Sequence, residues 1–270
     1  MAAHEEPSGH LASFDEPPVA EVAAGIQFRS LFGVRGIALG PLRERWREQY
    51  PHVQEMPPLP PQIEASPAGG PVFQLGFGPV PSSRYWFLNE DHTELVQVQN
   101  DRLVVNWRRG SKGGAYPRYG AIRGLFADRR ADLEAFLAEE TLGVLDVVQV
   151  ELTYINSIPE LVNRPADEVL SGLRWPQLDE LGRPEQVRAS ASFVVPEMGV
   201  TPVRLYLSVE PGTELDGGPT AFLTVTVRGA AEQGNGDTTL AFLDEAHEHV
   251  VRSFTEVTTE SMHRTWKRTQ

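Results

Sequence analysis

The stretch that decides the fold is LVQVQNDRLVVNWRR, Leu95–Arg109. Asn100 and Asp101 tolerate the backbone angles of a tight turn, so the stretch predicts a hairpin of two antiparallel strands with Gln99 opposite Arg102. Because strand residues alternate between faces, one face of the hairpin is apolar and the other is polar. The apolar face comprises Val96, Val98, Leu103, Val105 and Trp107, and the polar face comprises Gln97, Gln99, Arg102, Asn106 and Arg108, with Val104 among them.

Strand and helix patterns follow one another in a similar order in the two halves of the chain. Before the hairpin, the patterns predict a strand over 19–28, a helix over 39–50, a proline-rich extended connector over 51–71, and strands over 72–77 and 85–88. After it, they predict a helix over 121–142 capped by Gly143, a strand over 147–158, a short helix over 165–172, strands over 187–195, 203–210 and 222–228, and a closing helix over 238–266.

These elements predict a single α+β domain over residues 17–270, preceded by a disordered acidic tail over residues 1–16. The domain divides into two pseudo-repeats, about 17–143 and 144–270, each with the order β-α-β(3–4)-α. Two such units form one antiparallel sheet with two long helices on one face. This order resembles the saddle of the TATA-binding protein and the related helix-grip folds, a likeness of topology that implies no shared function.

The sheet face away from the helices is expected to be open, polar and concave, because twisted sheets curve. It should carry Glu21, Gln27, Gln97, Gln99, Arg102, Asn106, Arg108, Gln149, Glu151, Thr153, Arg204, Tyr206, Ser208, Thr224, Thr226 and Arg228. An ordinary solvated sheet face is one interpretation of this surface. A binding surface is the other, and it lacks the apolar wedges and the positive charge of a DNA-binding saddle, so its expected occupant is a protein or a polar small molecule.

Composition narrows the class of protein. The chain has 270 residues, of which 40% are hydrophobic and 23% charged, as in ordinary globular proteins. It has no cysteine, which excludes disulfides, thiolate zinc sites and a cysteine nucleophile. A net charge of −13 makes nucleic acid an unlikely partner. The chain shows neither a membrane-spanning apolar run nor a secretory signal pattern, so we expect a cytoplasmic protein that does not contact membranes.

The segment Arg102–Arg123 is locally basic and has aromatic residues between its charges. It contains Arg102, Arg108, Arg109, Lys112, Arg118 and Arg123, together with Trp107, Tyr116 and Tyr119. Arginine beside aromatic rings suits phosphate or single-strand binding, but GSKGG (Gly110–Gly114) lacks the spacing of a P-loop. Two other interpretations stay open: the arginines pair with acidic residues elsewhere in the fold, or they form a patch for an acidic partner protein.

The closing helix contains histidines and carboxylates but no recognisable catalytic or metal-binding spacing. Glu245 and His249 lie four residues apart, yet the pattern is not that of a zinc protease. His247 follows the apolar stripe of the helix, which predicts a histidine in the core or at its boundary. Nucleophile elbows, dinucleotide-binding glycine motifs and carboxylate pairs are missing from the sequence, so we predict no catalytic residues, no metal and no cofactor.

Several short motifs together resemble a known group of proteins. They are PPVAEV (Pro17–Val22), QVQNDR (Gln97–Arg102), NWR (Asn106–Arg108), YPRY (Tyr116–Tyr119), ELTYIN (Glu151–Asn156) and the closing residues Phe254, His263 and Trp266. In this order they resemble a sporadically distributed, uncharacterised bacterial protein family of similar length. The resemblance covers the chain from Pro17 to Trp266 and carries over no catalytic residue. A patchy distribution suits accessory genes, such as those of defence systems.

The leading hypothesis is therefore a non-enzymatic binding or adaptor protein that docks a protein partner on the polar face. The first alternative is a small-molecule-binding module with a pocket between the sheet and the closing helix, near His247 and Trp266. The second is an enzyme of unknown class that uses Glu151, Arg102 and His247. The candidate binding residues are Gln97, Gln99, Arg102, Asn106, Arg108, Tyr116, Glu151 and Asn156.

Overall fold

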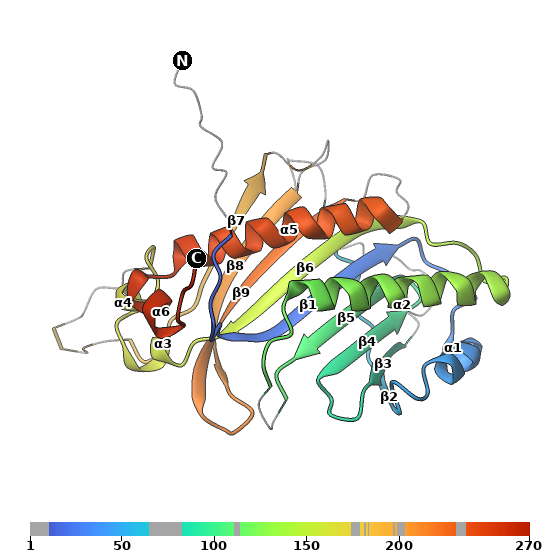
Figure 1. Cartoon of the computed structure of the whole chain (residues 1–270), viewed down its shortest axis with the longest axis horizontal. Coiled ribbons are helices and arrows are strands. Elements are labelled where there is room, and N and C mark those ends of the chain that lie inside the picture. Colours follow the sequence, from blue (N-terminus) through green and yellow to red (C-terminus); the bar gives the residue numbers. More distant parts are fainter. Residues whose placement is uncertain are drawn as a thin grey trace, which may run out of the picture.

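The chain folds around one large antiparallel sheet (Figure 1). The structure is a computed structural model and describes residues 11–64, 83–110, 114–173, 179–180, 182, 184–196, 198, 203–230 and 236–270. In this part of the chain, nine strands pair in the order β2-β3-β4-β5-β1-β6-β9-β8-β7. Their bounds are β1 Val19–Phe28, β2 His52–Met56, β3 Arg84–Leu88, β4 Glu94–Gln99, β5 Arg102–Arg108, β6 Val147–Ser157, β7 Ala189–Val195, β8 Val203–Thr213 and β9 Pro219–Ala230. The predicted α+β class and the single antiparallel sheet are confirmed.

The hairpin of β4 and β5 has the register that its turn residues predict. Gln99 pairs with Arg102 across the two-residue turn. The register continues across the sheet, because Arg102 pairs with Gln27 of β1 and Gln27 pairs with Gln149 of β6. These four side chains stand in line over four adjacent strands, and we call them the polar row. The hairpin therefore sets the position of one row of side chains across the middle of the sheet.

Two long helices, α2 (Tyr119–Glu139) and α5 (Gly236–Val257), lie over the same face of the sheet (Figure 1). The strand residues that point toward them form the main core, with Val22, Leu152 and Val225 fully buried. Phe126 of α2 and Leu243 of α5 pack into the same core. One face of the sheet is therefore apolar and covered by helices, which leaves the other face to the polar residues.

The first helical region is shorter than expected and packs against α2. Instead of a helix over 39–50, the chain forms a 3-10 turn, η1 (Gly36–Leu39), and one short helix, α1 (Gly40–Arg45). The predicted apolar side is nevertheless buried, since Trp46 and Tyr50 are no more than 1% exposed. The Trp46 indole donates a hydrogen bond of 2.8 Å to Asp132 of α2.

Other element boundaries differ from the predictions for identifiable reasons. The proline-rich segment contains an edge strand, β2, in a five-residue run between prolines that pairs with β3. The short helix expected over 165–172 is a single turn, α4 (Ala166–Val169), and a second single turn, α3 (Glu160–Asn163), precedes Pro165. The closing helix ends at Val257, because Thr259 caps a separate helix, α6 (Glu260–Thr265), by accepting a hydrogen bond from the Met262 amide. Helix α2 ends at Glu139, before Gly143, and the predicted strand over 72–77 lies outside the described residues.

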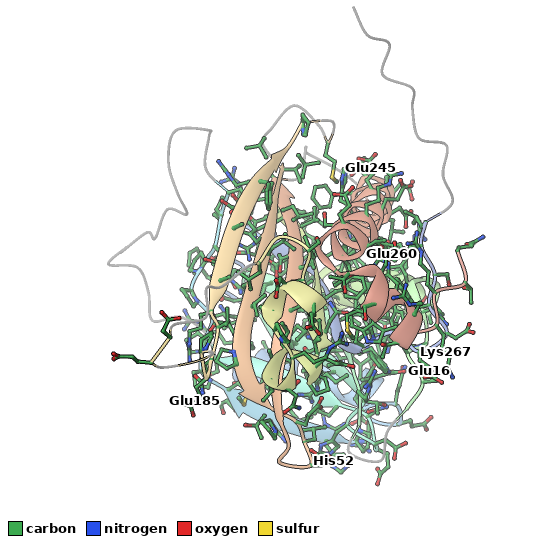
Figure 2. All side chains as sticks on the ribbon, turned by 90° about the vertical axis from the view of Figure 1, so that its left-hand side faces the viewer. Glu16, His52, Glu185, Glu245, Glu260 and Lys267 are labelled. Atoms are coloured by element: carbon green, nitrogen blue, oxygen red, sulfur yellow. The ribbon has the colours of Figure 1, made fainter. Side chains whose placement is uncertain are left out.

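The N-terminal segment contacts the C-terminal end of the chain. Residues 1–10 lie outside the described part, but residues 11–16, which we expected in a disordered tail, pair with the segment after α6. The Phe14 ring is 5% exposed and packs edge-on against Phe254 and Trp266. Glu16 and Lys267 form an ion pair at the edge of the molecule (Figure 2). Buried aromatic contact explains why this acidic segment has a defined position.

The sheet order places β1 and β6, the first strands of the two predicted repeats, next to each other at the centre. The remaining strands of each repeat lie on their own side, and α2 and α5 close the two repeats. The internal duplication and the specific likeness to saddle-shaped or helix-grip folds stay predictions. No helix in the described part of the chain is both long enough and apolar enough to cross a membrane.

Candidate functional site

The polar face of the sheet is crossed by the chain itself. Residues 57–64, the described part of the predicted proline-rich connector that follows β2, run over the polar row and are held by its glutamines; from here on, the connector means these residues. The Gln99 amide accepts a hydrogen bond from the Leu59 N–H at 2.9 Å and donates to the Leu59 carbonyl at 3.1 Å. Gln27 makes the same pair of bonds with the main chain of Gln62, at 3.1 and 2.8 Å. The polar row thus binds an extended backbone.

The same pattern continues along the connector to its last described residue. Gln149 accepts a hydrogen bond from the Glu64 N–H at 2.8 Å and donates to the Gln62 carbonyl. The Glu64 carboxylate then accepts bonds from Arg204 at 2.5 Å and from the Tyr206 hydroxyl at 2.6 Å. Its side chain is only 3% exposed, so the last described residue of the connector takes part in a buried ion pair.

The polar face is therefore less open than the sequence predicts. Gln99, Arg102 and Gln149 are 2%, 7% and 1% exposed, and the connector covers them. Further along the same face, Glu151 pairs with Arg228, and the Thr153 and Thr226 hydroxyls lie 2.8 Å apart. These contacts place the predicted polar residues on the predicted face, but most of their hydrogen-bonding capacity is used inside the molecule.

A polar cavity of about 230 Å³ remains between the connector and the sheet. Four predicted site residues line it: Gln97, Arg102, Asn106 and Glu151. Its walls also include Ala23 and Gly25 of β1, Arg84, Thr153, and Leu59, Pro60 and Gln62 of the connector. The structure therefore brings half of the predicted binding residues together around one polar cavity that is partly open to solvent.

A chain of hydrogen bonds fixes the amides on one wall of this cavity. Arg84 and the Trp86 indole both donate to the Gln97 carbonyl oxygen, at 2.8 and 3.0 Å. The Gln97 amide donates to Asn106 at 2.7 Å, and Asn106 donates to Glu21 at 2.6 Å. Burial raises the pKa of the Glu21 carboxyl, an effect that the hydrogen bond from Asn106 opposes. Each amide is thereby held in one orientation.

The opposite face of the sheet holds a larger cavity of about 370 Å³. It lies between α5, the start of α2, strands β1 and β6, and the N-terminal segment. Its lining is mostly apolar: Leu11, Ala12, Phe14, Pro17, Pro18, Val19, Gly120, Val250, Val251 and Phe254, with Ser13, Tyr116, Arg118, Tyr119, Tyr154, Asn156 and His247 as its polar members. Two predicted site residues, Tyr116 and Asn156, therefore belong to this apolar cavity. They do not lie on the polar face.

Four polar members of the apolar cavity, Tyr116, Tyr119, Tyr154 and His247, are connected to one another. The Tyr116 and Tyr154 hydroxyls lie 2.8 Å apart, and the Tyr154 hydroxyl lies 3.1 Å from Nδ1 of His247. Tyr119 stacks on the His247 ring with centroids 4.0 Å apart and donates a hydrogen bond of 2.7 Å to Asp244. The aromatic and hydrogen-bonding contacts fix the imidazole at the cavity wall.

Burial lowers the pKa of His247 to about 4, and the nearby Asp244 carboxylate opposes this shift only in part. Burial likewise raises the pKa of Tyr154, whose neighbour Tyr116 adds to the effect. At neutral pH the cavity wall therefore presents a neutral imidazole and neutral phenols. These groups can exchange hydrogen bonds with a ligand without carrying a charge themselves.

The His247 shift predicts a pH dependence of stability. The unfolded chain binds a proton near the ordinary pKa of 6.5, whereas the folded protein binds it only near 4, so the free energy of unfolding falls as the pH drops through this window. We expect a loss of roughly 2–3 kcal/mol between pH 7 and about pH 4.5. Urea unfolding at the two pH values should show that His247→Gln removes most of this loss. His52→Gln, at an exposed position, should keep it, and an equal loss in all three proteins would contradict the assignment.

The basic segment Arg102–Arg123 does not form one patch. Arg109 donates to the carbonyl of Val19 at 2.8 Å, Arg118 donates to that of Phe14 at 2.9 Å, and Arg123 forms an ion pair with Asp244 at 2.7 Å. Arg108 lies over the Trp86 ring at 5.5 Å, and Lys112 lies outside the described residues. The interpretation that these arginines make contacts within the fold is the one that the geometry supports.

Of the eight predicted binding residues, Gln97, Gln99, Arg102, Asn106, Arg108 and Glu151 share the polar face, and Tyr116 and Asn156 lie on the other. The hypothetical catalytic trio of Glu151, Arg102 and His247 is wrong as a single site, because the sheet separates His247 from the other two. Glu64 was missed, since a glutamate in a proline-rich segment shows no periodic pattern. Tyr154 could have been predicted as a site residue, because it lies two residues before Asn156 in β6 and therefore on the same, helix-facing side of the sheet.

Scans against models of known protein families, against curated protein sequences and against solved structures each returned no significant match. The resemblance to an uncharacterised bacterial family thus stays a prediction. Within the described residues, no group of three or more His, Cys, Asp or Glu side chains is placed to hold a metal ion.

Proposed function

We propose that this protein binds a small, largely apolar molecule in the cavity between the sheet and α5. The cavity of about 370 Å³ carries this proposal. Its size lies in the range of small-molecule sites, and its apolar lining with a few convergent polar groups is typical of them. It also lies beside His247, where the small-molecule hypothesis expected a pocket; Trp266 does not line it but packs against Phe254, which does.

The polar members of the lining indicate the chemistry of the ligand. The neutral His247 imidazole and the Tyr154 hydroxyl favour an uncharged hydroxyl or carbonyl group on the ligand over a charged group. The Arg118 guanidinium lies on the same lining and faces the Tyr116 ring at 5.9 Å. We therefore expect a ligand with an apolar body, held by Val250, Val251 and Phe254, and a single polar head that points toward Tyr154 and His247.

Filling the cavity tests this proposal. Val251 lines the cavity and is only partly buried, so Val251→Phe adds volume there without overpacking the main core. Ala241 lies on the same helix but is exposed, which makes Ala241→Phe the matched control. We expect saturable binding of N-phenyl-1-naphthylamine, an uncharged apolar fluorescent probe, to the wild type and to Ala241→Phe. The affinity for the probe should fall about tenfold or more in Val251→Phe, because the added ring takes up space that the probe needs. Forcing extra volume into a filled site costs about 1–3 kcal/mol.

Native mass spectrometry of the protein purified from its own host should then identify the ligand as a non-peptide mass retained by the wild type and depleted in Val251→Phe. Equal probe binding by all three proteins would place the probe elsewhere and contradict the proposal. Circular dichroism spectra of the variants serve as the folding control.

The adaptor hypothesis, in which a protein partner docks on the polar face, has less geometric support. The connector covers Gln99, Arg102 and Gln149, so a partner would have to bind outside the polar row or displace residues 57–64. A cytoplasmic location and an accessory role in bacteria stay predictions alongside it.

A further inference from the structure

The polar cavity on the other face of the sheet exists because of two small residues in β1. In VAEVAAGIQF the positions that face this side after Glu21 are Ala23 and Gly25, followed by Gln27. Ala23 pairs with Asn106 on one side and Thr153 on the other, so a methyl group stands between two longer side chains. At Gly25, an added Cβ would lie 3.1 Å from Val104 and 3.3 Å from the Leu103 carbonyl oxygen. Both residues line the cavity beneath the connector, and their lack of longer side chains leaves it room beside Val104.

Two guanidinium groups border this space and are incompletely bonded. Arg102 is 7% exposed, and its Nη2 donates to Gln27 at 3.2 Å and to the Pro60 carbonyl at 3.0 Å. Its Nε is buried without a hydrogen-bond partner, since the Asp101 carboxylate lies 3.6 Å away. Arg84 donates through Nη1 to Gln97, and its Nε also lacks a partner. An unsatisfied buried donor on a charged group is costly, so a further acceptor beside either guanidinium group would be favourable. Both arginines line the cavity, which is where such an acceptor has room.

Among the described residues that line the cavity, two carry a guanidinium group and one carries a carboxylate. Glu151 borders the cavity but pairs with Arg228, and Asp101 is the acidic neighbour of Arg102. Within the described part of the chain, Arg84 has no carboxylate at ion-pair distance. Burial lowers the pKa of Arg84, and the charge of Arg102 lowers it further, as expected for two neighbouring cations. One negative charge placed between them would relieve this repulsion.

We propose that the polar cavity binds a small oxyanion, a carboxylate or a phosphate, between the guanidinium groups of Arg84 and Arg102. Guanidinium groups recognise such anions through charge-assisted hydrogen bonds, which are stronger than bonds between neutral groups. The cavity of about 230 Å³ restricts the ligand to a compact molecule. The Thr153 hydroxyl lines the same space and adds a hydrogen-bonding group beside the anion. This site is separate from the apolar cavity, because the sheet lies between them.

Isothermal titration calorimetry with inorganic phosphate and with succinate, against sodium chloride of equal ionic strength, tests this site. We expect saturable binding of at least one anion with a stoichiometry of one. Tighter binding of phosphate would indicate a phosphate-bearing ligand, and tighter binding of succinate an organic acid. Arg84→Gln should weaken the affinity about 10- to 100-fold, the usual effect of losing a charged hydrogen-bonding group.

Two further variants keep the test decisive. Ala23→Val fills the cavity while retaining every arginine, and it should also weaken binding about tenfold or more. Arg188→Gln removes an exposed arginine that pairs with Glu210, so it should bind the anion as the wild type does. Absence of saturable heat for both anions would overturn the proposal. Anion binding that neither Arg84→Gln nor Ala23→Val weakens would overturn it as well. If Arg84→Gln does not fold, the affinity of Ala23→Val alone tests the proposal.

Discussion

Replacing Glu64 by glutamine is expected to lower the free energy of unfolding by about 2–4 kcal/mol, because it removes a buried charge from an ion-pair network. The Glu64 carboxylate is 3% exposed and accepts hydrogen bonds from Arg204 and Tyr206. Arg228 lies 3.6 Å from Oε1 of Glu64, the oxygen that accepts the hydrogen bond from Tyr206. The neutral amide keeps the shape of the side chain but removes the negative charge between the two guanidinium groups.

Urea unfolding of the wild type and Glu64→Gln at neutral pH measures this effect. The matched control is Glu44→Gln, which breaks an exposed ion pair with Arg47 in which the glutamate side chain is 61% exposed. Exposed pairs contribute about 0–1 kcal/mol, so this control should differ little from the wild type. If the two variants lost the same stability, the contacts of Glu64 would not be what holds the connector on the sheet.

Replacing Phe254 by alanine is expected to lower the free energy of unfolding by about 3–5 kcal/mol, as large-to-small substitutions of buried phenylalanines do. Phe254 is 7% exposed and packs against Phe14 and Trp266, with ring centroids 5.8 and 5.2 Å away. Its loss removes the contact that joins the N-terminal segment and the end of the chain to α5. It also enlarges the apolar cavity, which Phe254 lines.

The control for this prediction is Phe193→Ala in the edge strand β7. Phe193 is 52% exposed, so its removal should change stability by no more than about 0.5 kcal/mol. Denaturant unfolding of both variants provides the comparison, and limited proteolysis near Phe14 reports on the N-terminal segment. A small effect of Phe254→Ala would mean that the aromatic contacts of Phe14 do not hold this segment in place.

The sheet could be predicted from the sequence because its strands alternate strongly. In the hairpin around Asn100 and Asp101, the turn residues fix the register, and the register fixes which side chains share a face. The same alternation in β1 and β6 placed Gln27, Gln149 and Glu151 on the polar face. Where apolar and polar residues alternated regularly along a strand, the sequence predicted both the strand and the face on which each side chain lies.

The connector could not be predicted in the same way. Its contacts join glutamine side chains to the peptide groups of residues 59–64, and peptide groups are the same in every sequence. Prolines also removed the periodic pattern on which strand predictions depend. The sequence therefore showed a polar face, but it did not show that another part of the chain covers it.

The apolar cavity could be predicted only in part. The helical stripe placed His247 at the boundary of the core, and the alternation of β6 places Tyr154 and Asn156 on the helix side. Tyr116 lies outside any strand or helix, so no repeating pattern of apolar and polar residues indicated on which side of the sheet its side chain lies. The cavity itself depends on the N-terminal segment around Phe14, whose acidic neighbours favoured disorder.

Recognition of the connector through its main chain has a consequence for how freely that segment can vary. Leu59 and Gln62 are held by their own amide and carbonyl groups, so most amino acids would serve equally well at those two positions. The strand glutamines that hold them tolerate no such exchange, because only a primary amide of that length offers the matching donor and acceptor. We therefore expect the strand glutamines to vary little among related sequences, whereas the residues at positions 59 and 62 vary freely. Glu64 is the exception in the connector, because its side chain is itself bound.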